Sequence, residues 1–165
     1  MRDIINHIKE ETQSTGSNIY WSVENNTIGE SALLVINDFG EENIPGMFVS
    51  EPIRKGHIRK FRKGFNTTHR TKISACARLK SMVEKGKLKI HSKPFITELK
   101  AFVASGTSYK AKTGETDDLV SSMLLAMRII TVLKDWDPKV YTSFSQADED
   151  TADRVYPLPL FISST

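Results

Sequence analysis

The sequence has a single cysteine, Cys76, and no apolar run that approaches the roughly 18 residues of a membrane span. A lone cysteine excludes an internal disulfide, and its small apolar neighbours in ISACARL predict a buried thiol in a reducing, intracellular setting. The charged N-terminal stretch MRDIINHIKEETQ lacks the apolar core of a signal peptide. No GxxxxGK[ST] phosphate loop occurs in the sequence, which excludes a P-loop ATPase motif. Together these absences predict a cytosolic protein.

The net charge of +3 conceals a strong asymmetry along the 165 residues. Residues 51–93 contain 14 of the 23 Lys and Arg residues but only 2 of the 20 Asp and Glu residues, so this stretch carries +12 and the remainder −9. One basic region on an otherwise acidic chain is typical of a polyanion-binding protein. A solvated, lysine-rich surface has the same composition. Composition alone leaves both interpretations open.

The apolar pattern predicts one α/β domain. A strand rich in aromatic and β-branched residues, 18–25, ends in Glu24-Asn25-Asn26. Thr27 with Glu30 has capping-box spacing ahead of a helix that ends near residue 39. The other predicted elements are strands at 47–51 and 87–91, an extended piece at 108–112, and helices at 1–14, 70–85, 92–103 and 117–134. The predicted apolar stripes include Phe102 and Val103 in the third of these helices and Leu119 in the last.

Two groups of carboxylates could carry chemistry. Glu24 lies at the end of a strand, where open α/β sheets place their ligands, although a strand-end glutamate can simply meet solvent. Asp117 and Asp118 begin a helix, and capping alone would account for one of them. A divalent cation would remove the repulsion between two adjacent aspartates. Convergence of the three carboxylates on Mg²⁺ or Mn²⁺ would suit phosphodiester cleavage, which two such ions about 3.5–4 Å apart promote.

The order of four segments resembles the C-terminal nuclease domain of the large terminase subunit of T4-like tailed bacteriophages. These segments are SVENNTIGESALLVI, GFNTTHRTK, IHSKPFITELKAF and YKAKTGETDDLVSSMLLAM, and the final YPLPLF is also similar. The resemblance covers residues 1–134. It implies an RNase H-like (RuvC/terminase-type) mixed sheet flanked by helices. It also implies a metal-dependent endonuclease that cuts concatemeric viral DNA during packaging with little sequence specificity.

The resemblance assigns roles residue by residue. The family's strand-borne glutamate, followed by Asn and a nearby Gly, falls on Glu24 with Gly29, and its late acidic pair falls on Asp117 and Asp118. These three residues are the expected catalytic and metal-binding set for two Mg²⁺ or Mn²⁺ ions, with Asp118 as the main direct ligand and Asp117 assisting. The family's first catalytic aspartate lies on an opening strand that has no counterpart here.

That departure predicts an N-terminally truncated domain. We expect a partial nuclease domain at residues 1–134, with a basic loop region at 51–69, and an acidic C-terminal tail at 135–165. Such a chain is a truncated gene product, one half of a split subunit or an expressed fragment. Two alternatives to an active endonuclease stay open. One is a catalytically inactive DNA-binding or assembly fragment, and the other is an RNase H-like nuclease of the resolvase or transposase type.

The expected partner is double-stranded DNA, because phosphate contacts by Lys and Arg supply affinity without reading sequence. The family also implies the ATPase domain, the small terminase subunit and the portal as partners, in the cytoplasm of an infected bacterial host. Missing strands would expose sheet edges, which predicts a homodimer through those edges. The candidate DNA-binding residues are Arg54, Lys55, Arg59, Lys60, Arg62, Lys63 and Lys72.

Overall fold

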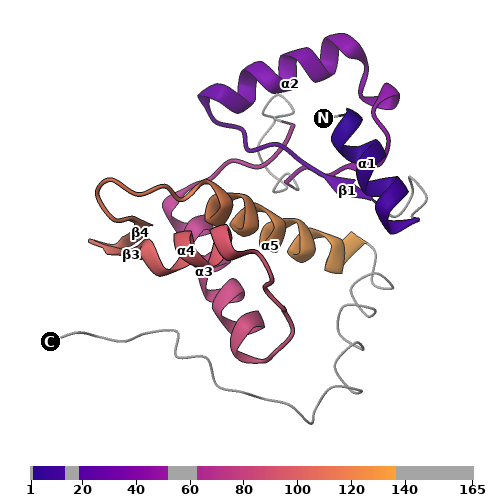
Figure 1. Cartoon of the computed structure of the whole chain (residues 1–165). Coiled ribbons are helices and arrows are strands. Elements are labelled where there is room, and N and C mark those ends of the chain that lie inside the picture. The colour runs from indigo at the N-terminus through magenta and orange to yellow at the C-terminus, as the bar shows by residue number, and fades with distance from the viewer. Residues whose placement is uncertain (1, 14–18, 52–62, 137–165) are drawn as a thin grey trace, which may run out of the picture.

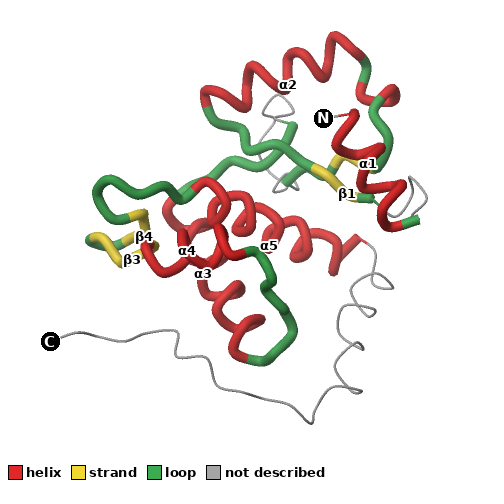
Figure 2. Tube along the Cα trace, in the orientation of Figure 1, coloured by secondary structure: helices red, strands yellow, loops and turns green. Residues whose placement is uncertain are grey.

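The computed structural model describes residues 2–13, 19–51 and 63–136. Within these ranges the chain forms a mixed α/β structure with five α-helices and two small sheets, which confirms the predicted α/β fold class (Figures 1 and 2). The elements in chain order are α1 (Arg2–Thr12), β1 (Tyr20–Trp21), α2 (Thr27–Phe39), the 3₁₀ helix η2 (Glu41–Asn43), β2 (Met47–Phe48), α3 (His69–Glu84), α4 (Lys93–Ala101), β3 (Phe102–Ser105), β4 (Ser108–Ala111) and α5 (Asp118–Trp136).

The extended stretch at residues 19–25, called here the central segment, pairs in parallel with two other stretches. Its first half, β1, pairs with β2, and Glu24 near its end forms a parallel bridge with Phe65. The backbone hydrogen bonds of this pairing run from Met47 N to Ile19 O (2.7 Å), Val49 N to Trp21 O (2.9 Å), Phe65 N to Val23 O (3.0 Å) and Asn25 N to Phe65 O (2.7 Å). They all use odd-numbered residues of the central segment, so both partner stretches lie along the same edge of it.

Three apolar clusters hold the elements together. The first packs α1 and α2 on the central segment through Ile5, Trp21 and Ile36. The second joins α3, α4 and α5, which Figure 1 shows grouped on the other side of the central segment. The third contains Val49, Phe65 and Leu133 and attaches α5 to the paired strands. The group formed by α3, α4 and α5 is therefore attached to the central segment and its paired stretches mainly through α5.

Local sequence signals account for most helix ends. Thr68 and Thr71 form a reciprocal capping box at the start of α3, and Gly86, with φ +70°, follows its end. Ser92 caps α4 by accepting from Phe95 N at 3.3 Å, with Pro94 in the first turn, which agrees with the helix start predicted at residue 92.

The predicted cap of α2 is wrong by one residue. Asn26, not Thr27, is the N-cap, because its Oδ1 accepts from Gly29 N at 2.8 Å. Thr27 is instead the first residue of the helix.

Three further predictions are wrong because residues outside the predicted element decide its hydrogen bonds or its buried face. Residues 87–91 form no strand, because Lys87 and Leu88 both donate their N–H to Met82 O and complete the end of α3. Phe102 and Val103 belong to β3 rather than to a helix, because the β3–β4 hairpin pairs Phe102–Ser105 with Ser108–Ala111. Leu119 is 42% exposed rather than in the core, because α5 buries the face that carries Val120, Leu124 and Met127.

None of the described helices is both long enough and apolar enough to cross a bilayer. Most of the predicted basic loop, residues 52–62, and the predicted acidic tail beyond residue 136 lie outside the described residues.

Candidate functional site

Glu24 lies at the end of the central segment and is partly exposed. Its Oε2 accepts a hydrogen bond from Asn26 Nδ2 at 3.2 Å. The same Asn26 side chain caps α2 through its Oδ1. One amide therefore holds the Glu24 carboxylate and the start of α2 in a fixed relation, which gives a physical role to the second asparagine of the Glu24-Asn25-Asn26 sequence.

Gly29, five residues after Glu24, lies where α2 passes close to the end of the central segment. A Cβ atom built at Gly29 would lie 1.7 Å from the backbone oxygen of Glu24, a distance that no side chain can occupy. Glycine is therefore required where α2 passes over the end of the strand. A second close approach occurs at Gly64, where φ is +83° and a Cβ would lie 2.4 Å from Val23 O. Both glycines let the backbone pack tightly around Glu24.

The N-terminus of α5 is capped by a residue from another helix. Glu98, on α4, accepts from Leu119 N at 2.8 Å and from Val120 N at 3.2 Å through Oε2, and from Thr116 Oγ1 at 3.0 Å through Oε1. The N–H groups of Leu119 and Val120 have no partner within the helix, and an aspartate at the start of the helix would otherwise accept from them. Asp117 and Asp118 are thus not needed as caps. The sequence analysis missed Glu98, because nothing in its local pattern indicates a contact about twenty residues away.

The two aspartates differ in their surroundings. Asp117 is partly buried, and its Oδ2 lies 3.7 Å from Lys72 Nζ, whereas Asp118 is exposed. Lys72 also lies over the Phe102 ring at 5.3 Å, a cation–π contact that holds the ammonium group in place. The positive charge offsets part of the repulsion between the paired carboxylates. Lys72, predicted as a phosphate-binding residue, is therefore adjacent to the acidic pair.

The connection between Glu24 and the aspartates runs through residues 65–72. Phe65 bridges Glu24 at one end of this stretch, and Lys72 contacts Asp117 at the other. Three extended steps and four helical residues separate Phe65 from Lys72, so their Cα atoms are at most about 17 Å apart. Across residues 2–13, 19–51 and 63–136, no group of three or more His, Cys, Asp or Glu side chains lies close enough to hold a metal ion. Convergence of Glu24 with both aspartates on one ion stays a prediction.

Of the seven candidate DNA-binding residues, the structure describes Lys63 and Lys72. Arg54, Lys55, Arg59, Lys60 and Arg62 lie outside the described residues. Lys63 donates to Glu41 Oε2 at 2.6 Å, and both side chains are more than one third exposed.

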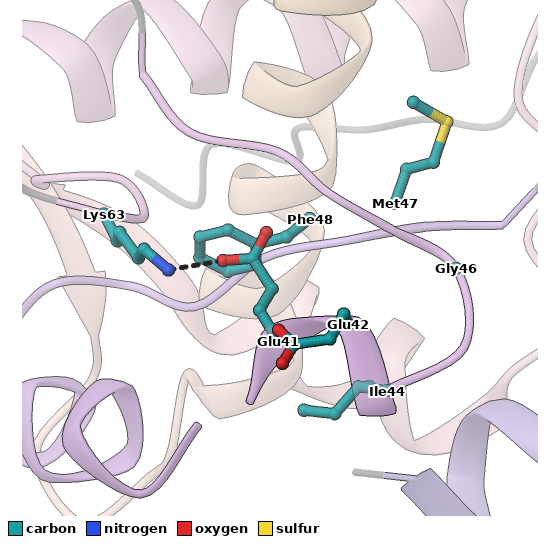
Figure 3. A pocket seen from close by; sticks show the side chains of 7 residues that line it. All are labelled: Glu41, Glu42, Ile44, Gly46, Met47, Phe48 and Lys63. Atoms are coloured by element: carbon teal, nitrogen blue, oxygen red, sulfur yellow. Dashed lines mark hydrogen bonds and ion pairs between the residues drawn. The ribbon is translucent and has the colours of Figure 1, made fainter. Parts of the chain in front are cut away.

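This ion pair lines an open cavity of about 500 Å³, whose wall also includes Met47 and Phe48 (Figure 3). The contact between Lys63 and DNA stays a prediction, and in this structure the Lys63 side chain is paired with the Glu41 carboxylate.

Cys76 lies one helical turn after Lys72 on α3 and is partly buried. Burial raises the pKa of its thiol above the usual value, although the positive charge of Lys72 opposes this effect. The thiol is therefore protonated at neutral pH, which agrees with a packing role rather than a nucleophilic one.

A comparison with protein families accords with this arrangement. The model of the terminase RNase H-like domain matches residues 4–128, a range that contains Glu24, both aspartates and Glu98. Because the match spans most of the chain, the protein belongs to the terminase RNase H-like domain family. The family is that of a nuclease domain of phage DNA-packaging terminases, as the sequence resemblance implied.

Proposed function

We propose that this domain is a metal-dependent DNA endonuclease of a T4-like phage packaging terminase, which cuts concatemeric viral DNA with little sequence preference. The observation that supports it most strongly is the capping of α5 by Glu98. Because Glu98 satisfies the helix N-terminus, the paired aspartates are not needed as its caps, and a role in binding a cation accounts for both. Membership of the terminase RNase H-like family supplies the reaction class.

The carboxylates fit a hard divalent cation by their chemistry. Glu24, Asp117 and Asp118 offer oxygen donors, which Mg²⁺ and Mn²⁺ prefer. When bound, such ions supply Lewis acidity and lower the pKa of a water molecule for attack on phosphorus. We assign Asp118 as the main ligand because it is exposed and its side chain enters none of the ion pairs between described residues. Asp117 is held by Lys72 and assists.

The remaining residues bind and orient the DNA in this proposal. Asn26 keeps the Glu24 carboxylate in a fixed direction, and Lys72 places a positive charge where a backbone phosphate would approach the acidic pair. The basic residues Arg54, Lys55, Arg59, Lys60, Arg62 and Lys63 contact further phosphates and set affinity rather than specificity. In the host cytoplasm the domain would work with the ATPase domain, the small terminase subunit and the portal.

Plasmid nicking tests the assignment. With Mg²⁺ or Mn²⁺ the chain should convert supercoiled DNA to open circles. Glu24→Gln and Asp118→Asn should reduce this conversion to background, and Asp117→Asn should reduce it in part. Asp38→Asn, which neutralises an exposed carboxylate on α2, is the matched control and should nick normally. Nicking that persists when all three site residues are alanine would remove these residues from the site.

A second candidate function is DNA binding or assembly without cleavage. It is favoured by the lack of a three-carboxylate group among the described residues. The prediction is salt-dependent binding of duplex DNA, with no nicking at any Mg²⁺ or Mn²⁺ concentration. The homodimer expected from open strand edges belongs to this candidate, and sedimentation of the chain as a monomer at micromolar concentration would count against it.

A further inference from the structure

Arg128, on α5, is the buried charged residue of the described chain, with 8% of its surface exposed. A buried guanidinium is costly unless its N–H groups find partners. Arg128 Nη2 donates to Glu51 Oε1 at 3.0 Å and to Asn66 O at 3.1 Å, and Nη1 donates to Thr67 Oγ1 at 3.2 Å. The guanidinium also lies over the Phe65 ring at 4.9 Å. The guanidinium thus donates three hydrogen bonds, and all of these partners of its side chain lie outside α5.

These partners belong to two stretches that run together. Glu51 N donates to Gly64 O, and Gly64 N donates to Ser50 Oγ, both at 3.1 Å. Residues 50–51 and 64–67 thus form one joined unit, and Arg128 fastens that unit to α5. The unit also includes Phe65, the residue whose backbone bridges Glu24.

Arg128 therefore links the two parts of the candidate site. On one side is the strand pair that places Glu24, and on the other is the helix that begins at Asp118, ten residues and about 15 Å along the axis from Arg128. The apolar contacts of Phe65 and Leu133 attach the same surfaces, but they are non-directional. The hydrogen bonds of Arg128 have fixed directions and can set the position of α5 along and around its own axis.

We propose that Arg128 is a positioning residue, which sets the distance between Glu24 and the aspartates through its hydrogen bonds to the 50–51 and 64–67 stretches. This inference rests on the proposed nuclease site, but the geometry it predicts can be measured without cleavage. A displacement of about 1 Å between catalytic groups can lower a rate about 10²-fold. Loss of Arg128 should therefore reduce turnover while leaving the affinity for DNA nearly unchanged.

The first experiment measures distance. Spin labels are placed at Ile28→Cys and Leu119→Cys, which are exposed near Glu24 and at the start of α5, in a Cys76→Ala background. The distance distribution should be narrow with Arg128 present and should shift or broaden in Arg128→Met. A label pair within α2, at Ile28→Cys and Phe39→Cys, is the control and should not change. An unchanged Ile28–Leu119 distribution in a folded Arg128→Met chain would overturn the proposal.

The second experiment measures nicking. Arg128→Met should lower kcat about 10²-fold with little change in KM for DNA. Arg128→Lys, which keeps the charge but loses the planar fork, should recover only part of the rate. Wild-type nicking with an unaffected Arg128→Met would overturn the positioning role and leave the nuclease function intact. A shifted label distance in a chain that never nicks would support the positioning role and count against the nuclease function.

A milder series covers the case in which Arg128→Met does not fold. Thr67→Val and Glu51→Gln each weaken one contact of the guanidinium. Each should broaden the Ile28–Leu119 distribution less than Arg128→Lys does. Distributions that stay identical to wild type across all three variants would contradict the inference.

Discussion

Because Glu98, and not Asp117 or Asp118, caps the start of α5, substitutions of these residues should differ in their effect on stability. Glu98→Ala removes the acceptor of three hydrogen bonds at the start of α5. Bonds to a charged group contribute about 1.5–3 kcal/mol when they are well shielded, and a typical helix cap contributes about 1 kcal/mol. Because Glu98 is partly exposed, we expect the free energy of unfolding to fall by about 2 kcal/mol. For a chain of this length that lowers Tm by about 4–8 °C.

Asp117→Asn and Asp118→Asn should behave differently. Each loses the interaction of a carboxylate with the helix dipole, about 0.3–1 kcal/mol, and Asp117→Asn also loses the ion pair with Lys72. Each substitution also relieves the repulsion within the pair, which offsets part of the loss. The change in stability should therefore be less than half of that caused by Glu98→Ala. Urea unfolding followed by circular dichroism measures both, provided the m-value is the same in all variants.

Divalent cations separate the two roles further. A cation at 100 times its Kd stabilises the folded state by about 2.7 kcal/mol. This increment should persist in Glu98→Ala and disappear in Asp118→Asn. If Asp117→Asn or Asp118→Asn destabilises the metal-free chain as much as Glu98→Ala, the aspartates are helix caps and the reasoning fails.

Three further predictions follow from particular contacts. Gly29→Ala should lower the free energy of unfolding by about 1–3 kcal/mol in thermal melts, because its methyl group would meet Glu24 O, whereas Ser31→Ala on the same helix should be neutral. Burial raises the pKa of the Cys76 thiol, so the protonated thiol favours folding below about pH 8.5, and this contribution is lost as pH rises through the folded pKa. Alkylation of Cys76 by iodoacetamide at pH 8 should therefore be slower in the folded chain than in urea. Equal rates in the two states would contradict this prediction. Lys63→Met should change stability by less than about 1 kcal/mol but reduce the salt dependence of DNA binding by about one ion, and an unchanged slope would remove Lys63 from the DNA contacts.

The helices were predictable because their signals are local. The spacing of Ala75 and Leu79 gives α3 its buried face, and Ser92 with Pro94 defines the start of α4. The strand that ends at Glu24 was predicted from its aromatic and β-branched residues, although the regular strand is shorter than expected. In each case the signal lies within a few consecutive residues, although the strand itself pairs with distant ones such as Met47 and Phe65.

The errors arose where partners outside the predicted element supplied its hydrogen bonds. Phe102 continues the apolar spacing of α4, yet pairing with Ala111 places it in a strand. Residues 87–91 look like a strand, but their first amides complete the end of α3. Local propensity is a weak guide when a nearby hairpin or helix end supplies the hydrogen bonds.

The sequence by itself determined the class of fold and supplied the candidate acidic residues, because periodicity and residue type carry that information directly. Tertiary structure alone decided what those residues are free to do. The cap supplied by Glu98 leaves the aspartates available, Lys72 lies beside Asp117, and Arg128 joins α5 to the stretch that pairs with Glu24. Each contact joins residues 21 to 77 positions apart in the chain, and no local pattern specifies a hydrogen bond over that separation.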